Sequence, residues 1–396
     1  MTKRWAITEF TATTALGSGR EATLQALREG RSALKPTQFE TAQLNSWIGI
    51  AEGVDEVQLP EDLAHYDCRN NRLAWLGLQA DGFAATVRQA RERHGAQRVG
   101  VFLGTSTSGI LSSEVAYRQR DGQTGALPSS FRYAETHSTG SLAAFVRDAL
   151  QLQGPAFVIS TACSSSAKAF AHAQRMLDQG MIDAAVVGGV DSLCLTILYG
   201  FNSLELLSPD ICRPWDAQRQ GLSLGEGAAF VLIERDDAQQ SKGWLLGVGE
   251  SSDGHHMSSP HPEGAGAAKA MRAALAQAGL QPEDVDYLNL HGTATPGNDA
   301  AEDAAVRTVF GTQLPCSSTK GATGHTLGAA GGVEAVISLL ALQHGLIPAG
   351  LNLREPDPML KAHYVQQPTA AQLKVVASNS FGFGGSNACV VFGAVA

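Results

Sequence analysis

Residues 158–170 read VISTACSSSAKAF, and the character of the chain changes within this stretch. Residues 158–161 suit a strand, whereas the small and apolar residues after Cys163 suit a helix. The order predicts a strand-to-helix corner with Cys163 at the corner and three serines behind it. A buried structural cysteine does not need neighbouring serines, and a disulfide cysteine needs a partner.

Short apolar runs that end in glycine-rich turns alternate with alanine-rich helical stretches along the chain. This alternation predicts an α/β protein whose sheet is buried between helices. The helical stretch after Cys163 is expected to end at Gly180, because glycine favours the conformation that follows a helix. The expected strands are 98–109, 156–165, 184–192 and 225–237, and the expected helices are 141–153, 164–180 and 266–279.

The second half of the chain repeats the plan of the first. VDYLNLHGTATPG (285–297) corresponds to RVGVFLGTSTSG (98–109), and residues 314–345 correspond to the corner around Cys163. Residues 375–392 correspond to the pair of strands that contains GGVDS (188–192) and GAAFVLIE (227–234). The repetition is one of layout more than of residue identity, and it predicts a duplicated α/β unit rather than a solenoid.

The seam between the two units is expected near 240–250. We predict an N-terminal half over 1–245, which carries the cysteine corner, and a C-terminal half over 246–396, which carries two histidine loops described below. No proline-rich linker separates the halves, so they are expected to share one core.

Composition limits the class of protein. The chain has 396 residues, 44% of them apolar and 17% charged, with 43 glycines. A chain of this length and composition can bury a large core and is not disordered. The net charge of −9 gives no reason to expect nucleic acid as a partner, because phosphate binding favours a basic surface.

The cysteines and the N-terminus indicate a reducing compartment. The six cysteines are scattered and form no CxxC pair, so zinc and redox-motif interpretations are weak. MTKRWAITEF (1–10) lacks the apolar region of a signal peptide. No uninterrupted apolar stretch approaches the roughly 20 residues of a membrane helix. We therefore expect a cytoplasmic protein without a membrane span.

Cys163 has two interpretations at this stage. A helix N-terminus lowers the pKa of a thiol through its dipole and free amides, and the thiolate is the reactive form. The same amides could hold a developing oxyanion. Alternatively, Cys163 is a small buried core residue, which is the common role of an isolated cysteine. The corner alone does not decide between them.

Two histidines lie at corresponding corners of the second half. HGTATPGND places His291 at the end of an apolar strand, and STKGATGHTLGAAGGVE places Lys320 and His325 in a glycine-rich loop before a helix. Together with Cys163 they are expected to converge on one pocket, although each histidine alone is more often structural. Two imidazoles can donate hydrogen bonds to one carbonyl oxygen and stabilise an enolate, which suits carbanion chemistry better than hydrolysis.

The motifs TACSSS, HGTATP, KGATGHTLGAAGGVE and NSFGFGGSN, with RPWDAQRQGLSLGEG (213–227), occur in one chain and in one order. This set resembles the condensing enzymes of the thiolase superfamily and is most similar to β-ketoacyl-acyl-carrier-protein synthases of the type I/II class. The resemblance implies duplicated βαβαβαββ halves that form a five-layered αβαβα core. Initiating synthases of the third type pair cysteine with one histidine and an asparagine, and the two histidines here depart from that pattern.

The resemblance also implies a two-step decarboxylative condensation. Cys163 would take an acyl group from acyl carrier protein as a thioester, with the amides of Cys163 and Phe383 as the oxyanion hole. His291 and His325 would stabilise the enolate formed when malonyl-carrier protein loses CO2. The carbanion would then attack the thioester and give a β-ketoacyl product two carbons longer. No metal or other cofactor is required, since the substrates are carried on the phosphopantetheine of acyl carrier protein.

Supporting roles follow from the same resemblance. Lys320 would orient His325 and set the local charge, and Glu334 would anchor the network. The residues implied in binding the substrate or its pantetheine arm are Thr293, Thr295, Phe383, Leu222 and Thr107. Plainer alternatives are a solvated loop charge for Lys320, a helix-surface carboxylate for Glu334 and a core position for Phe383. His255 and His256 resemble metal ligands, but a flexible loop is the favoured interpretation.

Some positions depart from the family pattern. Leu222 replaces a phenylalanine expected near the pocket, Gln220 replaces an aspartate, and Ala294 stands where serine is common. These changes favour a second hypothesis, a specialised aryl-polyene or polyketide-like synthase that pairs with a chain-length-factor homologue as a heterodimer rather than forming a homodimer. A third hypothesis is that the chain is itself the non-catalytic chain-length partner, but such partners lack the nucleophilic cysteine.

Acyl carrier protein is acidic, so its docking surface is expected to be locally basic despite the net charge of −9. Arg69 and Arg72 in DCRNNRLAWLG are the candidates for this surface. The alternative is that both are ordinary exposed charges of a helix.

Overall fold

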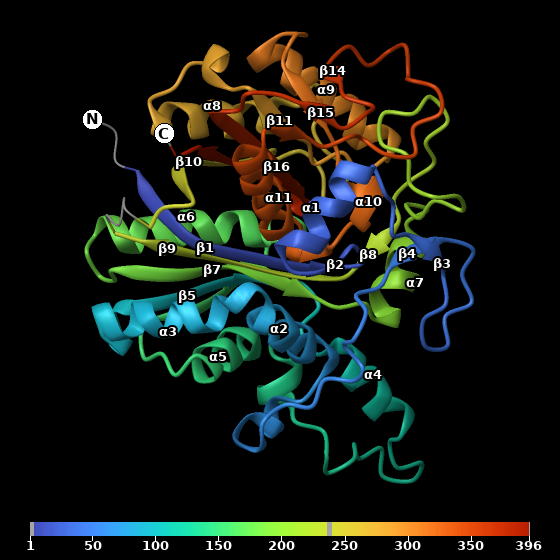
Figure 1. The fold of residues 1–396 in the computed structure, drawn as a ribbon. Helices are drawn as coiled ribbons and strands as arrows, with labels where there is room; N and C mark the ends of the chain where they lie inside the picture. The colour runs from blue at the N-terminus through green and yellow to red at the C-terminus, as the bar shows by residue number, and fades with distance from the viewer. Residues whose placement is uncertain (1–3, 236–239, 396) are drawn as a thin grey trace.

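The computed structural model describes residues 4–235 and 240–395. Residues 1–3, which begin the segment searched for a signal peptide, lie outside the described residues, as do the last two residues of the strand expected over 225–237. Figure 1 shows two sheet layers that alternate with three helical layers. The five-layered α/β core implied by the resemblance is therefore confirmed.

Both halves build their sheet with the same strand order and the same strand directions, which confirms the duplication. In each half the first and the last strand are antiparallel neighbours, and the three remaining strands run parallel to one another. The first order is β1 (Trp5–Thr14), β9 (Gly227–Glu234), β7 (Ala184–Asp191), β5 (Val99–Gly104) and β6 (Ala156–Ile159). The second is β10 (Gly243–Ser252), β17 (Ser386–Gly393), β16 (Val375–Gly382), β11 (Tyr287–Asn289) and β12 (Pro315–Ser317), extended by β14 (His363–Tyr364).

Two helices, α6 (Ser165–Asp178) and α11 (Ala330–His344), form the middle layer between the sheets (Figure 1). α11 is buried from its first residue through Leu342, because a sheet or a helix covers each side of it. Within the described residues, Leu327–His344 is the one helical segment long and apolar enough to cross a membrane, and 89% of it is buried inside the protein. Its apolar character thus matches its place in the core.

The remaining helices cover the outer faces of the two sheets and their rims. α2 (Arg69–Gln79), α3 (Phe83–His94) and α5 (Gly140–Ala149) cover the first sheet, and α8 (Ala265–Ala278) and α9 (Pro296–Phe310) cover the second (Figure 1). At the rims lie α1 (Arg20–Glu29), α4 (Ile110–Arg118), α7 (Leu195–Ser203) and α10 (Lys320–Thr323). The short strands are β2 (Gly17–Ser18), β3 (Lys35–Pro36), β4 (Trp47–Gly49), β8 (Leu224–Gly225), β13 (Leu346–Ile347) and β15 (Thr369–Ala370).

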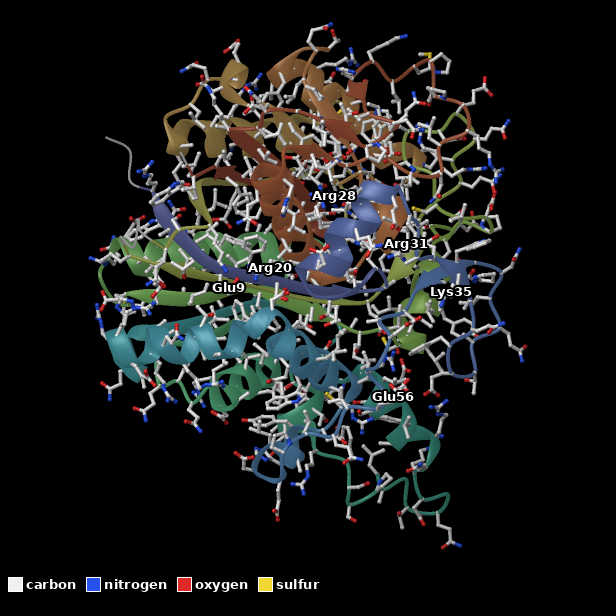
Figure 2. The ribbon with its side chains drawn as sticks, in the orientation of Figure 1. Glu9, Arg20, Arg28, Arg31, Lys35 and Glu56 are labelled. Atoms are coloured by element: carbon white, nitrogen blue, oxygen red, sulfur yellow. The ribbon has the colours of Figure 1, made fainter. Side chains whose placement is uncertain are left out.

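The two halves are joined by hydrogen bonds between their first strands. β1 pairs antiparallel with β10, with Trp5 opposite Leu245. Beside this pairing, Glu9 on β1 accepts hydrogen bonds from Lys242 and from Arg20 at the start of α1, both at 2.7 Å, and Figure 2 shows Glu9 and Arg20 side by side. The boundary expected between residues 245 and 246 falls inside β10, so the halves meet within a strand and not at a linker.

The duplicated topology also fixes where a site can form. The carboxyl ends of parallel strands face one edge of their sheet, so the loops after those strands gather there. In the first half these loops follow β5, β6 and β7, and in the second half they follow β11, β12 and β16. The segment after β6, which carries Cys163, meets the segments after β11, β12 and β16 around one cavity.

Candidate active site

Cys163 lies at the strand-to-helix corner that the sequence predicts. β6 ends at Ile159 and α6 begins at Ser165, so the thiol stands directly before the helix. Ala162, the residue before it, has a φ of 52°, in the left-handed region that non-glycine residues rarely adopt. A strained turn of this kind persists only where the surrounding contacts hold it.

The serines after Cys163 supply those contacts. Ser164 Oγ donates to Thr161 O at 2.9 Å, and Ser165 Oγ donates to Ala162 O at 2.5 Å. The third serine connects the two halves, because Gly332 N on α11 donates to Ser166 Oγ at 2.9 Å. The hydroxyls therefore hold the turn and the two central helices together, which answers why small hydroxyl residues surround the cysteine.

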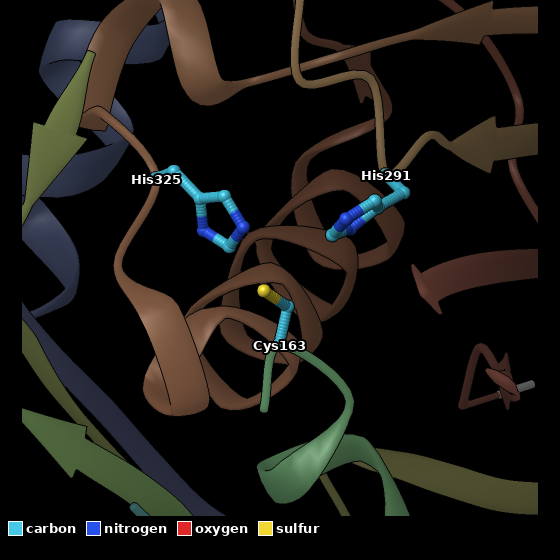
Figure 3. Close-up of side chains that lie close together, drawn as sticks. All are labelled: Cys163, His291 and His325. Atoms are coloured by element: carbon cyan, nitrogen blue, oxygen red, sulfur yellow. The ribbon is translucent and has the colours of Figure 1, made fainter. Parts of the chain in front are cut away.

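The two histidines reach Cys163 from the second half, as predicted. His291 follows β11, and His325 lies between α10 and α11. Figure 3 shows the Cys163 sulfur between the two imidazole rings. The ring centroids are 5.3 Å apart and the ring planes are nearly perpendicular, at 86°. The sulfur and one nitrogen of each ring all lie within 4.8 Å of one another, and all three side chains are buried.

The neighbours of each Nδ1 atom identify the tautomers. His325 Nδ1 accepts a hydrogen bond from Leu327 N at 3.1 Å. His291 Nδ1 lies 3.5 Å from the Lys320 ammonium, which can only donate. Burial and the Lys320 charge hold the pKa of both histidines well below the usual range, so both rings are neutral. With the lone pair on Nδ1, each ring carries its hydrogen on Nε2, and the site holds two neutral N–H donors.

Lys320 and Glu334 form a buried pair behind His291. The Lys320 ammonium donates to Glu334 Oε1, and the two side chains are 2% and 3% exposed. Burial raises the pKa of Glu334 to about 7, against the opposing effect of Lys320. The anchoring contact expected for Glu334 is present. Lys320 contacts His291 and the Leu327 amide holds His325, so the predicted role of Lys320 in orienting His325 gains no support from these contacts. Its charge nevertheless lowers the pKa of both histidines.

The pKa of Cys163 differs from the sequence expectation. Burial raises it to about 12, and the nearby Lys320 charge, which lowers it, offsets only part of that effect. The position before a helix led to the opposite expectation, because a local motif does not reveal how completely the folded chain removes water from the thiol. At neutral pH the resting group is therefore the protonated thiol.

Alkylation of Cys163 by iodoacetamide is expected to speed up about tenfold per pH unit between pH 7 and pH 9, without a plateau, because the thiolate fraction rises in that proportion below the pKa. The rate is measured by mass spectrometry of the peptide that contains Cys163. Cys212 serves as the control, since it is also buried with a pKa raised to about 12 but lies outside the cavity. A plateau below pH 8 would show that the thiol is activated in the resting enzyme.

The cavity beside Cys163 has an open volume of about 570 Å³, including the part that opens to solvent. Apolar side chains form one wall, and the rings of Phe201 and Phe383 stack there at 5.6 Å. The predicted substrate-binding residues Thr293, Thr295, Leu222 and Phe383 all line the cavity.

The last residue of β16, Gly382, lies directly against the Cys163 corner. A side chain at Gly382 would place its first carbon 2.5 Å from Thr161 O and 3.2 Å from Ser164 N. The backbone at the end of β16 therefore approaches the Cys163 turn as closely as glycine allows. This brings the segment containing Phe383 beside the cysteine, as an oxyanion hole built from both would need.

The structure does not support the predicted binding roles of Thr107 and Arg69. Thr107 is buried and does not line the cavity; its hydroxyl and its amide both donate to Asp191. Arg69 is only 8% exposed and donates to both oxygens of buried Glu226 and to Asp55, so it does not offer a free charge to a docking protein. Both corrections arise because distant residues fold over these side chains.

Arg72, the other docking candidate, lies on the same helix and is better placed. Its side chain is 32% exposed, and it donates to both carboxylate oxygens of Asp67 at 2.5 and 2.6 Å. Its charge is thus partly neutralised within the chain. The loop histidines His255 and His256 are exposed and belong to no cluster of metal-ligand type within residues 4–235 and 240–395.

Sequence reasoning missed two buried carboxylates that hold the His291 loop. Glu302 on α9 accepts hydrogen bonds from His291 N at 2.8 Å and Gly292 N at 2.7 Å, and burial raises its pKa to about 7. Asp299 accepts from Ala294 N at 3.2 Å, where Ala294 has a φ of 65°. The available signal was the spacing of acidic residues on the helix that begins at Pro296, the last residue of HGTATP.

The side chains of Cys163, His291 and His325 lie close enough together to be considered as ligands of a metal ion. The donor pattern does not fit one, because a histidine that binds a metal through Nε2 carries its hydrogen on Nδ1. Here the Leu327 amide and the Lys320 ammonium face the two Nδ1 atoms, so that hydrogen would meet another donor. The arrangement suits donation to an oxygen atom.

Comparison with known proteins agrees with this chemistry. Residues 70–239 match the family model described as "Beta-ketoacyl synthase, N-terminal domain", and residues 243–354 match "Beta-ketoacyl synthase, C-terminal domain". "3-oxoacyl-[acyl-carrier-protein] synthase 2" of Coxiella burnetii and "Nodulation protein E" of Rhizobium meliloti are each 34% identical over 99% of both chains. The ketosynthase ApeO of Xenorhabdus doucetiae, solved in complex with its chain length factor ApeC, is 37% identical over 99% of this chain and 98% of that one, with a TM-score of 0.89.

Proposed function

The chain belongs to the β-ketoacyl synthases of the thiolase superfamily and is a condensing acyltransferase, and from this we propose how its own residues divide the reaction. We propose that Cys163 holds the growing acyl group, that His291 and His325 stabilise the enolate, and that acyl carrier protein delivers both substrates. The observation that carries the proposal is the pair of neutral Nε2–H donors beside one buried thiol. No metal or nucleotide takes part in the proposed steps.

In the first step, the sulfur of Cys163 attacks the thioester carbonyl of the acyl-carrier protein. A carbon–sulfur bond forms to Cys163, the bond to the pantetheine sulfur breaks, and the proton of the Cys163 thiol ends on the pantetheine sulfur. The backbone amides of Cys163 and Phe383 would hold the oxygen that becomes negative. The contact of Gly382 with the cysteine corner supports this assignment.

In the second step, malonyl-carrier protein loses CO2. The carbon–carbon bond to the carboxylate breaks, and its electron pair moves into an enolate whose oxygen accepts hydrogen bonds from Nε2 of His291 and His325. Neutral donors suit this role, because they stabilise the developing charge without giving up a proton. Thr293 and Thr295 line the same cavity and would bind the pantetheine arm.

In the last step, the enolate carbon attacks the thioester on Cys163. The new carbon–carbon bond lengthens the chain by two carbons, the bond to the Cys163 sulfur breaks, and the released sulfur takes up a proton from solvent water. The raised pKa of Cys163 agrees with this return to the thiol. Incubation with acyl- and malonyl-carrier proteins is expected to give CO2 and β-ketoacyl-carrier protein in equal amounts, whereas hydrolysis of the acyl group alone would contradict the proposal.

A second chain of the same fold is the partner proposed for the open edge of the first sheet. Within the described residues β6 pairs only with β5, and Phe157 on β6 is 55% exposed. An unpaired edge with an exposed aromatic residue favours pairing with another chain. ApeO, the relative with 37% identity, is solved with a chain length factor, which supports a heterodimer with a homologue that lacks the cysteine. High condensing activity of the chain alone, as a homodimer, would contradict the heterodimer.

The choice of primer tests whether the enzyme serves a specialised polyene-like pathway. Leu222 lines the cavity at the position where the family resemblance led to the expectation of phenylalanine, so we expect the acyl site to accept a more rigid or bulky primer. Saturated and aryl-polyenoyl carrier-protein primers are offered together, and a preference for the polyenoyl primer is expected. Leu222→Phe is the matched variant and should reduce that preference. A clear preference of the wild-type enzyme for saturated primers would contradict the specialised role.

A further inference from the structure

Asp191, at the carboxyl end of β7, is a fully buried carboxylate that no step above uses. It accepts hydrogen bonds from the loop after β5, from Ser106 N at 2.9 Å and Thr107 N at 2.9 Å. The hydroxyls of Thr105, Ser106 and Thr107 also donate to it, at 2.5, 2.6 and 2.7 Å. The carboxylate therefore fixes this loop through both its backbone and its side chains.

The same carboxylate reaches across to the second half of the molecule. Gly328 N donates to Asp191 Oδ2 at 2.6 Å, and Gly328 lies three residues after His325. The preceding amide, Leu327 N, donates to His325 Nδ1. Two consecutive backbone amides of this turn therefore donate hydrogen bonds, Leu327 N to the His325 imidazole and Gly328 N to Asp191. Leu327 has a φ of 56°, so the turn is strained and depends on its contacts.

We infer that Asp191 is a positioning residue for His325. By holding Gly328, it anchors the turn that keeps the Leu327 amide on Nδ1, and so keeps the Nε2–H donor directed into the cavity. The inference rests on the proposed function, because it assigns Asp191 to the decarboxylation and condensation steps, in which His325 donates to the enolate. The hydrogen bonds of Asp191 described above go to residues 105–107 and to Gly328, and not to the Cys163 turn.

The inference predicts that the two half-reactions separate. Asp191→Asn keeps the size of the side chain but turns an amide group toward donors that need an acceptor. Decarboxylation of malonyl-carrier protein is expected to slow by about 10- to 100-fold, because a catalytic donor displaced by about 1 Å loses most of its effect. Acyl loading of Cys163 is expected to fall by no more than about threefold, since the cysteine corner has its own serine contacts and the loss of the Asp191 charge, which raises the pKa of Cys163, favours the thiolate.

Gly328→Ala tests the same contact from the other half. A first side-chain carbon at this position would lie 2.8 Å from Asp191 Oδ2 and 2.9 Å from Ser106 N, so the turn must shift while the carboxylate remains. We expect the same separation of the two rates. Gly122→Ala is the control for the glycine change, because nothing lies within 4 Å of the added carbon.

Glu234→Gln is the control for the loss of a buried carboxylate. Glu234 lies opposite Ala184 and Asp191 lies opposite Gly227, so the two acids mark the two ends of the same β7–β9 pairing. Glu234 binds Thr8, Arg93 and His94, away from the cavity. Any slowing in this variant is expected to affect loading and decarboxylation equally, because it would reflect only a smaller folded fraction.

The experiment measures acyl loading by intact mass and CO2 release for the wild-type enzyme and these four variants, in the assembly in which the wild type is active. Slower decarboxylation with retained loading in Asp191→Asn and Gly328→Ala, and in neither control, is the expected result. Equal slowing of both half-reactions, or no slowing, would overturn the role of Asp191 while the wild type still condenses. A wild-type enzyme that neither loads nor decarboxylates would overturn the proposed function and this inference with it.

Discussion

Replacing Lys320 by methionine is expected to lower the free energy of unfolding by up to about 3–5 kcal/mol, because Glu334 loses its partner and must either stay charged in the core or take up a proton there. The two side chains are 2% and 3% exposed, so water cannot replace the lost contact. Decarboxylation should also fall, since the Lys320 ammonium faces His291 Nδ1 and fixes its tautomer. Urea unfolding followed by circular dichroism measures the stability.

The double variant Lys320→Met with Glu334→Leu separates the two effects. Removal of both charges is expected to restore most of the stability, because no unpaired charge then remains in the core. Decarboxylation is expected to stay low, since His291 still lacks its ammonium neighbour. If Lys320→Met alone unfolds at the same urea concentration as the wild type, the buried Lys320–Glu334 pair does not stabilise the folded protein as proposed.

Replacing His325 by alanine is expected to slow decarboxylation by about 10²- to 10³-fold, the usual effect of removing one donor to a developing oxyanion. His325 is buried and neutral, and its Nε2–H is one of two donors in the cavity. The rate is measured as CO2 release from malonyl-carrier protein under single-turnover conditions, so that product release does not limit it.

His291→Ala is expected to behave in the same way, and the double variant should lose less than the sum of the single losses, because both donors serve one oxygen. His255→Ala is the control for a histidine lost from the exposed loop and should retain full activity. Retention of more than half of the decarboxylation rate by His325→Ala would contradict the role given to the imidazole.

The duplicated fold and the three reacting side chains could be predicted because their signals are local. Cys163 and His291 each follow a strand at a corner with small residues, and His325 lies in the glycine-rich segment that follows β12 and α10. When parallel strands of both halves end at the same edge, the residues that follow those strands come close together there. This holds without knowledge of how individual side chains pack. Convergence of the three groups was therefore a topological prediction.

The supporting contacts could not be predicted, because they join residues far apart in the sequence. Arg69 was expected to be an exposed charge on a helix, but it is buried and forms an ion pair with Glu226, which lies 157 residues later in the sequence. Thr107 serves Asp191 instead of the cavity, and Lys320 faces His291 instead of His325. The position of Cys163 before a helix indicated a lowered pKa, but the folded chain excludes water from the thiol and raises it.

In the proposed reaction, Cys163 carries the acyl group. The most direct test of this role is intact-mass analysis after incubation with a mixed pool of acyl-carrier proteins, followed by mapping of the modified peptide. One acyl adduct per chain, located on Cys163, is expected, with neither an adduct nor condensation in Cys163→Ala. An adduct on another residue, or full condensing activity in Cys163→Ala, would contradict this role.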